Sequence, residues 1–459
     1  MNTNTEPKVS FIVPCYKLGH LLSQCVNSIL EQDFSDFEIL IMNNDSPDNT
    51  AEVAESFHDP RVKHVRNETN LGHIRNYNKG LTLARGKYAW LLSADDMLRS
   101  PSVLQRYVDV LERNPGVGFV FCRAVELQGD KETGIAPWAD CGDQDRIWND
   151  KSFFTHLLKD NCIVACTVLV RKECYQKVGM FHLELPFASD WHMWAMLAMH
   201  YDVAYLAEPM LTSRVHGESL TSLYAKEYTR ICVGDELSVL WILSNEAEHS
   251  GLSSLHTECE AAFVQRAVHL LMARLEGATP SMTGAEFEEI LQTRLKDAAG
   301  IKHMRSAVCN ALAEYVTALK YRHDPPISVA DEIGVLWSFQ HQAELTNEPT
   351  LRAACESVLI NRAVHFLTAG YRHANPSMSE TEFESILQNQ IPDVNGIRDT
   401  RASVYTTLAE QQYCGGEYAI AARSYRLALT ARPWRLKTRA KYMLLHTGTV
   451  GIRIRQLAG

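Results

Sequence analysis

Apolar runs and amphipathic segments alternate along residues 8–122. Short apolar runs indicate buried strands at residues 9–13, 37–42, 62–65 and 88–92. Apolar positions at helical spacing predict helices at residues 21–30, 51–57, 74–84 and 100–110. Strands that alternate with helices at this spacing form βαβ units, so the sequence predicts an α/β domain with a mainly parallel sheet.

Polar residues follow three of these predicted strands at the point where each strand ends. Tyr16 follows the first strand, residues 43–45 follow the second, and Asp95 and Asp96 follow the fourth. Ligands of open α/β sheets bind beyond the carboxyl ends of the strands. The positions of these side chains therefore predict a ligand site at that edge of the sheet.

Beyond about Tyr228 the strand signals stop and long helical periodicity replaces them. Four short motifs in this region recur at an offset of 96 residues, which indicates a duplication. They are Asp235–Trp241 with Asp331–Trp337, Arg266–His269 with Arg362–His365, Pro280–Met282 with Pro376–Met378, and Glu286–Glu288 with Glu382–Glu384. A period of this length predicts that each copy is a small domain of several helices. Because apolar residues follow both His269 and His365, we expect these histidines to pack inside rather than to bind a ligand.

The sequence thus predicts four parts. They are an α/β domain at residues 1–225, a first helical copy at 226–325, a second copy at 326–415 and a basic helical tail at 416–459. Residues 417–445 indicate a helix pair interrupted at Pro433, which resembles a tetratricopeptide-like hairpin. Helical arrays present surfaces to partners. Homo-oligomerisation, docking of a partner protein and binding of a long glycan are all open for the helical copies.

The composition is that of an ordinary globular protein, with 46% hydrophobic and 22% charged residues. No stretch approaches the roughly 20 apolar residues of a membrane-spanning helix, and residues 1–10 lack the pattern of a secretory signal. We therefore expect a cytoplasmic protein. The 12 cysteines are scattered and form no CxxC pair, which favours reduced, buried thiols over disulfides or a zinc site.

The net charge of −10 argues against nucleic-acid binding. After Glu417, however, the chain has nine basic and no acidic residues. Such a tail is attracted to anionic lipid, at about 1 kcal/mol for each basic residue near the surface. A peripheral contact with the inner face of the membrane and a solvated helix that balances the acidic body are both open.

Asp95 and Asp96 are the candidates for a metal site, because Mn²⁺ and Mg²⁺ prefer carboxylate oxygens and bridge them to substrate phosphates. The alternative is a pair of N-cap residues for the helix that follows. Asn44 and Asp45 are candidates for contacts with a base and a ribose. The alternative is that these residues form an Asx-turn and an N-cap for the helix near Thr50.

Asp190 stands at the start of an apolar helix, where it is a candidate general base or an N-cap. Arg214 and His216 lie in a polar segment that follows an apolar one. Either side chain suits a diphosphate or a metal, although a lone histidine is more often structural.

The first half of the chain resembles a family 2 glycosyltransferase of the GT-A fold, which is Rossmann-like with a mainly parallel sheet. The resemblance covers residues 8–225. The matching stretches are VSFIVPCYKLGHLLSQCVNSILEQDFSDFEILIMNNDSPDNT, NLGHIRNYNKGLTLARGKYAWLLSADDML, ASDWHMWAMLA and SRVHGESLT. They occur in the order and at the spacing of the family.

This resemblance implies a nucleotide-sugar donor, with a UDP-sugar favoured, and a Mn²⁺ or Mg²⁺ ion. The implied site consists of Pro14, Tyr16, Asn44, Asp45, Arg75 and Asp95 around the nucleotide, Asp95, Asp96 and His216 at the metal, and Asp190 as the catalytic base. The chain departs from the family at two positions, where the family often has an acidic residue. At these positions this chain has Asn44, which affects the expected preference for the base, and Ser93, which affects the expected affinity for the metal.

The resemblance implies transfer by a single displacement that inverts the anomeric carbon. The expected acceptor is a glycan or lipid-linked hydroxyl, as in surface-polysaccharide synthesis. The alternative is a scaffold in which a degenerate transferase domain accompanies partner-binding helices. A nucleotidyltransferase is disfavoured, because no glycine-rich basic loop follows the first strand.

Overall fold

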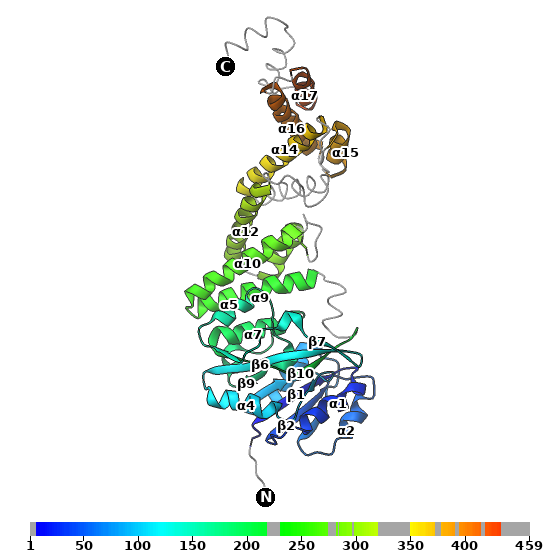
Figure 1. Ribbon diagram of the computed structural model, residues 1–459, viewed down its shortest axis with the longest axis vertical. Coiled ribbons are helices and arrows are strands. Elements are labelled where there is room, and N and C mark those ends of the chain that lie inside the picture. Colours follow the sequence, from blue (N-terminus) through cyan, green and yellow to red (C-terminus); the bar gives the residue numbers. More distant parts are fainter. Residues whose placement is uncertain are drawn as a thin grey trace. The chain divides into compact units, whose positions relative to one another are not determined.

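A computed structural model describes residues 6–217, 230–273, 281–282, 284–295, 298–319, 349–371, 378–390, 394–414 and 418–432 (Figure 1). The chain divides into two compact units, residues 1–263 and 264–459. The first unit therefore includes residues 230–263, which the sequence pattern assigned to the first helical copy. The four expected domain boundaries stay predictions.

The first unit is built on one mixed sheet. Its strands are β1 (Val9–Cys15), β2 (Phe37–Asn43), β3 (Val62–Arg66), β4 (Tyr88–Leu91), β5 (Met97–Leu98), β6 (Val117–Gln128), β7 (Lys131–Ile135), β8 (Arg146–Trp148), β9 (Leu169–Arg171) and β10 (Asp202–Val215). The order is β3-β2-β1-β4-β9-β6-β10-β5, with β7 beside β6 and β8 beside β10. Strands β1 to β4 are parallel, β9 runs antiparallel to both β4 and β6, and β10 is parallel to β6. The predicted mainly parallel sheet of an α/β domain is confirmed.

Helices pack on both faces of this sheet. Those of the first unit are α1 (Gly19–Leu30), α2 (Thr50–Glu55), α3 (His73–Leu83), α4 (Val103–Arg113), α5 (Ser152–Leu157), α6 (Cys174–Val178), α7 (Ser189–His200) and α9 (Arg230–His249). Apolar residues of α1 and α4 share one buried cluster with inward-facing residues of β1, β2 and β4. Helix α3 packs on the other face, where a Cβ at Gly80 would come within 2.3 Å of the Ile12 side chain. Only glycine permits this close approach.

The duplication is confirmed by the helices of the C-terminal half. They are α10 (Ser253–Ala273), α11 (Gly284–Ile290), α12 (Ala298–Leu319), α14 (Pro349–Tyr371), α15 (Glu380–Gln390), α16 (Val394–Cys414) and α17 (Tyr418–Ala431). Helices α14 and α16 begin exactly one repeat after α10 and α12. The Glu288–Arg305 ion pair of 2.6 Å also has its counterpart one repeat later, between Glu384 and Arg401.

The expectation that the repeated histidines pack inside is wrong, because His269 and His365 are both exposed. In α10 the buried positions around this residue are Ala267 and Leu270. Two residues along an α-helix turn about 200° around its axis, so His269 points away from the face that Ala267 buries. The motif 331–337 and residues 280 and 376–377 lie outside the described residues.

The eleven described cysteines whose burial is known are free thiols, and all except the partly exposed Cys141 are buried. The expectation of buried cysteines is thus confirmed for ten of them. Of the basic tail, Arg423 pairs with Glu380 and Arg432 with Asp399, while residues 433–459 lie outside the described part. Among the described helices, none has the length and apolarity needed to cross a bilayer.

Candidate active site

The carboxyl ends of four strands bring the predicted polar residues to one edge of the sheet. Cys15 at the end of β1 is in register with Asn43 at the end of β2. The parallel strand β4 ends on the same edge and leads into Asp95 and Asp96. The long strand β10 ends at Val215, directly before His216. Segments that are far apart in the sequence therefore meet at the predicted ligand edge.

Asp95 and His216 are in direct contact, with Oδ2 of the carboxylate 2.9 Å from Nε2 of the imidazole. Oδ1 of Asp95 is buried and has no hydrogen-bond partner among the described residues. The neighbouring Asp96 lies behind it, where its Oδ1 accepts a 3.0 Å hydrogen bond from the backbone N–H of Arg214. Neither aspartate caps a helix, because the N-cap of α4 is Ser102. The capping alternative is therefore wrong.

The pKa values of the two adjacent carboxylates shift in opposite directions. Burial disfavours the charged form of Asp95, but hydrogen bonds from His216 and Ser93 outweigh it and hold its pKa below the ordinary value. Burial and the negative charge of Asp95 together raise the pKa of Asp96. The pair therefore presents one ionised carboxylate toward His216. The Ser93 hydroxyl supports that ionised state.

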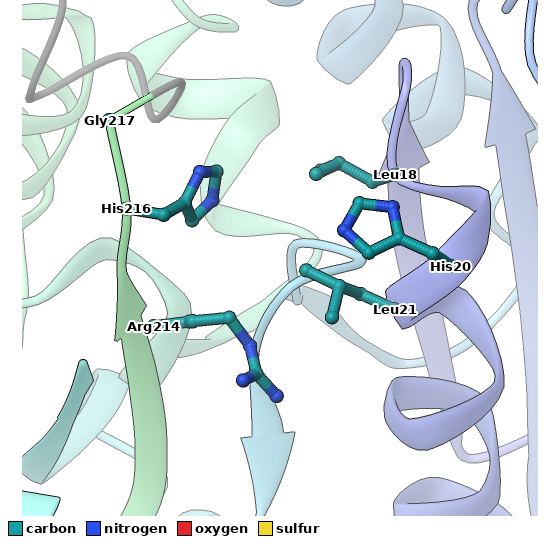
Figure 2. Close-up of a pocket in the computed structure, with 6 residues that line it drawn as sticks. All are labelled: Leu18, His20, Leu21, Arg214, His216 and Gly217. Carbon is teal, nitrogen blue, oxygen red and sulfur yellow. The ribbon is translucent and has the colours of Figure 1, made fainter. Parts of the chain in front are cut away.

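A pocket of about 230 Å³ opens beside this pair (Figure 2). One wall is the start of α1 and the turn before it, which contribute Leu18, His20 and Leu21. The opposite wall is the end of β10, with Arg214 and His216. Figure 2 shows the side chains of His20 and His216 facing each other across the space. The pocket is lined by cationic or neutral groups, a setting suited to an anionic ligand.

Arg214 lines this wall and also forms hydrogen bonds that stabilise it. Its Nε donates to the backbone oxygen of Asp95 at 3.2 Å, and its Nη2 donates to Oε1 of Gln24 on α1 at 2.9 Å. The guanidinium thus connects β10, the β4 strand end and α1. Such a planar fork of donors fixes the relative positions of the three segments.

Asn44 is buried and bonded within the protein. Its Oδ1 accepts hydrogen bonds from Nδ2 of Asn67 and from the backbone N–H of Leu71, both at 2.9 Å. Its Nδ2 donates to Oδ1 of Asn70 at 2.9 Å. The amide therefore holds the segment that leads into α3. Its role as a contact to the base stays a prediction.

The hydrogen bonds that form the turn and the start of α2 are accepted by Asn43 and Asp48 rather than by Asn44 and Asp45. Oδ1 of Asn43 accepts the backbone N–H of Ser46, and Oδ1 of Asp48 accepts that of Thr50 at the start of α2. Asp45 has a φ of 55° and lies 3.2 Å from Arg66. The sequence pattern indicated the turn chemistry correctly but assigned it to the wrong residues.

Asp190 is the second residue of α7, whose N-cap is Ala188, so its capping alternative is wrong. Its Oδ1 accepts the backbone N–H of Trp191 at 2.8 Å, and its Oδ2 accepts Nδ2 of Asn161 at 3.2 Å. Burial raises the pKa of this carboxyl, while the two hydrogen bonds act against the rise. A carboxylate with a raised pKa is suited to accept a proton.

Tyr77 on α3 is a further residue of this region that the sequence pattern did not single out. Burial raises the pKa of this phenol, and the charges of Asp95, Asp190 and Asp96 raise it further. All three carboxylates therefore lie within electrostatic reach of one side chain. The missing signal was the position of Tyr77 one helical turn after His73, on the same face of α3.

The remaining predicted residues are Pro14, Tyr16 and Arg75, which lie at the end of β1 and at the start of α3. Pro14 is buried near the end of β1, and Tyr16, which follows the strand, is 40% exposed. Arg75 is exposed in the first turn of α3 and has no ion-pair partner among the described residues. An exposed aromatic ring and an unpaired cation are available for ligand contacts. Their assignment to the nucleotide stays a prediction.

The donor set fits a divalent cation that is shared with a substrate. In the described part of the chain no group of three or more potential ligand residues converges. Asp95 nevertheless offers a buried oxygen that has no hydrogen-bond partner among the residues described, and His216 lies beside it. Mg²⁺ commonly uses one or two protein ligands together with water and substrate phosphates. Asp95 and His216 can supply such a pair.

Comparison with known proteins shows what the N-terminal domain is similar to. Residues 10–179 match the family described as Glycosyl transferase family 2. An uncharacterised glycosyltransferase of Haemophilus influenzae is 29% identical over 229 residues, 48% of this chain and 69% of that protein. An uncharacterised protein of Mycobacterium tuberculosis is 38% identical over 218 residues, 46% of this chain and 67% of that protein. The crystal structure of S. aureus TarS 1–349 is similar with a TM-score of 0.48 and 16% identity, over 76% of this chain and 90% of that one.

Proposed function

The chain belongs to glycosyltransferase family 2 through its N-terminal domain, and from this premise we propose an inverting transfer of a sugar from a nucleotide-diphosphate donor to an acceptor hydroxyl. The observation that best supports the proposal is the 2.9 Å contact between Asp95 and His216 at the strand ends, where His216 lines the pocket. Burial raises the pKa of Asp190, whereas hydrogen bonds from His216 and Ser93 hold the pKa of Asp95 below its ordinary value. Paired groups of this kind divide proton transfer and charge binding between them.

Asp190 is the general base in this proposal. Its carboxylate takes the proton of the acceptor hydroxyl, and the acceptor oxygen attacks the anomeric carbon. The bond between that carbon and the diphosphate breaks in the same step, so the configuration inverts. Asn161 and the backbone N–H of Trp191 orient the carboxylate toward the acceptor. Proton transfer to a positioned base typically contributes about 10²–10⁴-fold to the rate.

The diphosphate belongs in the pocket between α1 and β10. Arg214 and His216 provide cationic or hydrogen-bonding groups on one wall, and His20 provides another on the opposite wall. Asp95 and His216 would hold Mn²⁺ or Mg²⁺, which supplies positive charge for the departing diphosphate. Asp96 accepts the N–H of Arg214 and so fixes the end of β10 beside this pair.

A UDP-sugar is the favoured donor within this proposal, in which the exposed ring of Tyr16 stacks on the base. A glycan or lipid-linked hydroxyl is the acceptor, with the helical copies available to hold a long chain. A scaffold function is the weaker candidate. The replacement of a family carboxylate by Ser93 was its only support, and the Ser93 hydroxyl instead helps to keep Asp95 ionised.

Thermal unfolding of the full chain with UDP, GDP, dTDP and CMP, each with and without Mn²⁺, tests the donor site. A ligand at 100 times its dissociation constant stabilises the folded state by about 2.7 kcal/mol. We expect stabilisation by one nucleoside diphosphate that depends on Mn²⁺. Absence of stabilisation by every nucleotide would overturn the proposal.

A further inference from the structure

A side chain of the duplicated helical motif contacts the segment that leads to the proposed base. Asp235 opens the motif Asp235–Trp241 and lies on α9. It is completely buried, with 0% exposure. Its Oδ2 accepts hydrogen bonds from the backbone N–H groups of Phe187 at 2.7 Å and Ala188 at 3.2 Å. These two residues directly precede α7, which carries Asp190.

The start of α7 has no capping side chain of its own. Its N-cap is Ala188, and no side-chain hydrogen bond forms from that position. Donors at a helix start have no partner inside the helix, and they cost stability when they are buried without another acceptor. Asp235 supplies an acceptor from 47 residues further along the chain. The carboxylate therefore ties α9 to the two residues that directly precede α7.

We propose that Asp235 is a positioning residue for Asp190. The inference rests on the proposed function, because it assigns to α9 the task of fixing the base of that reaction. Asp190 is only two residues beyond Ala188, so a shift of the 187–188 backbone moves its carboxylate directly. A misplacement of about 1 Å at a reacting group can cost about 10²-fold in rate.

Helix α7 is buried along almost its whole length. Ten of its twelve residues, all except Asp190 and His200, are buried. Asp190 itself is held by Asn161 and by the N–H of Trp191, and both bonds depend on where the helix begins. The bonds to Asp235 fix that beginning. This gives the first copy of the repeated motif a role in the reaction.

Three variants of the full chain test the inference. Asp235→Ala removes the acceptor, and Asp235→Asn keeps an oxygen that can accept the same N–H groups while removing the charge. Asp331→Ala changes the equivalent residue of the second copy and serves as the matched control. The assay is release of UDP from UDP-sugars with Mn²⁺, with water as the acceptor, together with the affinity for UDP. Amide hydrogen exchange reports on Phe187 and Ala188.

We expect Asp235→Ala to lower kcat by about 10- to 100-fold while the KM for the donor and the UDP affinity stay unchanged. Exchange at Phe187 and Ala188 should become faster. Asp235→Asn should retain most of the wild-type kcat and most of the protection from exchange at Phe187 and Ala188. Asp331→Ala should match the wild type in both measurements. A variant that unfolds would lose UDP affinity and would be recognised by circular dichroism, in which case Asp235→Asn decides.

Wild-type kcat in Asp235→Ala, or equal losses in Asp235→Ala and Asp331→Ala, would overturn the inference. So would an Asp235→Asn variant that folds and binds UDP but is as slow as Asp235→Ala. An inactive wild-type protein would instead overturn the proposed function, and the inference with it. The two failures are therefore distinguishable by the wild-type rate alone.

Discussion

The contact between Nε2 of His216 and Oδ2 of Asp95, at 2.9 Å, joins two segments that are 121 residues apart. Asp95 follows β4 near the middle of the sheet, and His216 follows β10 beyond β9 and β6. The contact leaves Oδ1 of Asp95 buried without a partner in the described part of the chain. An ionised carboxylate beside an imidazole, at the mouth of a pocket, is a suitable pair for a cation that also binds phosphate.

The first prediction concerns this pair. Asp95→Asn and His216→Ala should each weaken the Mn²⁺-dependent affinity for UDP by about tenfold or more, since each removes one of two protein ligands. Titration calorimetry with UDP, with and without Mn²⁺, measures the effect. His20 lines the other wall of the same pocket. His20→Ala serves as the control, because it should weaken UDP binding equally with and without Mn²⁺. Unchanged metal dependence in Asp95→Asn would contradict the assignment.

The second prediction concerns the pH dependence of the reaction. Burial raises the pKa of Asp190, and a general base acts only when it is unprotonated. The rate should therefore rise with pH through a pKa above the ordinary aspartate value of about 3.9. Asn161→Ala removes a hydrogen bond that favours the carboxylate, so the rising limb should move to higher pH.

The pH profile of kcat for donor hydrolysis checks this prediction. Asn149→Ala changes an exposed asparagine of a neighbouring segment and should leave the profile in place. A rising limb that Asn161→Ala does not move would show that Asp190 is not the group that titrates.

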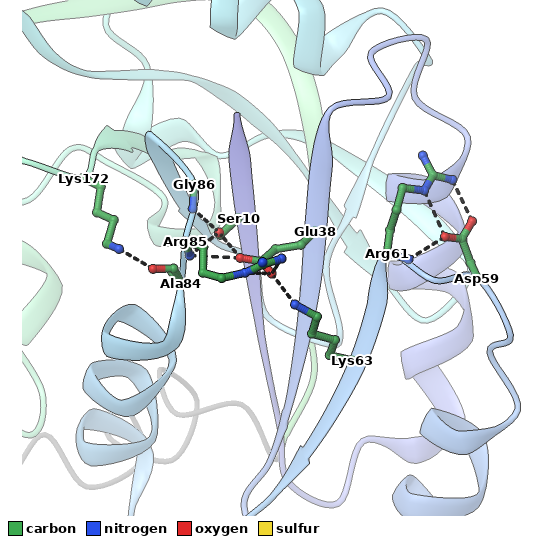
Figure 3. Close-up of polar contacts among 9 residues, drawn as sticks. All are labelled: Ser10, Glu38, Asp59, Arg61, Lys63, Ala84, Arg85, Gly86 and Lys172. Atoms are coloured by element: carbon green, nitrogen blue, oxygen red, sulfur yellow. Dashed lines mark hydrogen bonds and ion pairs between the residues drawn. The ribbon is translucent and has the colours of Figure 1, made fainter. Parts of the chain in front are cut away.

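The third prediction concerns a buried carboxylate away from the site. Glu38 on β2 accepts hydrogen bonds from Ser10, Lys63 and Arg85, whereas Asp59 and Arg61 form a more exposed pair nearby (Figure 3). Glu38→Gln should lower the free energy of unfolding by about 2 kcal/mol at pH 7. This is less than the roughly 3–5 kcal/mol of a fully buried pair, because Lys63 and Arg85 are about half exposed. Asp59→Asn, the control, should cost less than about 1 kcal/mol.

The effect of Glu38 should also depend on pH in a defined direction. Burial opposes ionisation of Glu38, but the hydrogen bonds outweigh it and lower its pKa to about 2. Its ionised form therefore stabilises the folded state above the unfolded pKa of about 4.3. That contribution is lost as the pH falls toward 2. The difference between wild type and Glu38→Gln in urea unfolding should shrink over this range, and a constant difference would contradict the assigned ionisation.

Local patterns were sufficient to predict the frame of the site. The apolar runs located β1 to β4, and the polar residues after them located the edge where Asp95, Asp96 and His216 meet. The offset of 96 residues located the duplicated helices, and the Glu288–Arg305 pair repeats with them. These features depend on periodicity and on the common direction of parallel strands, both of which can be recognised in a sequence.

Contacts between distant segments could not be predicted in this way. The hydrogen bond between Asn44 and Asn67, the effect of the carboxylates on the pKa of Tyr77 and the hydrogen bonds that Asp235 accepts all depend on tertiary packing. The sequence marks each of these residues only as polar or aromatic. The error at His269 has a similar cause, since apolar neighbours do not show which face of the helix a residue occupies.

The most direct test of the proposed function is the rate of nucleoside diphosphate release by the full chain and its Asp190→Asn variant. The donors are UDP-N-acetylglucosamine, UDP-glucose, UDP-galactose and GDP-mannose, each with Mn²⁺. We expect the wild type to release the diphosphate from one of them. Asp190→Asn should bind the same nucleotide with equal affinity but react about 10²–10⁴-fold more slowly. Release by Asp190→Asn at the wild-type rate, or no release by the wild type from any nucleotide-sugar, would contradict the account.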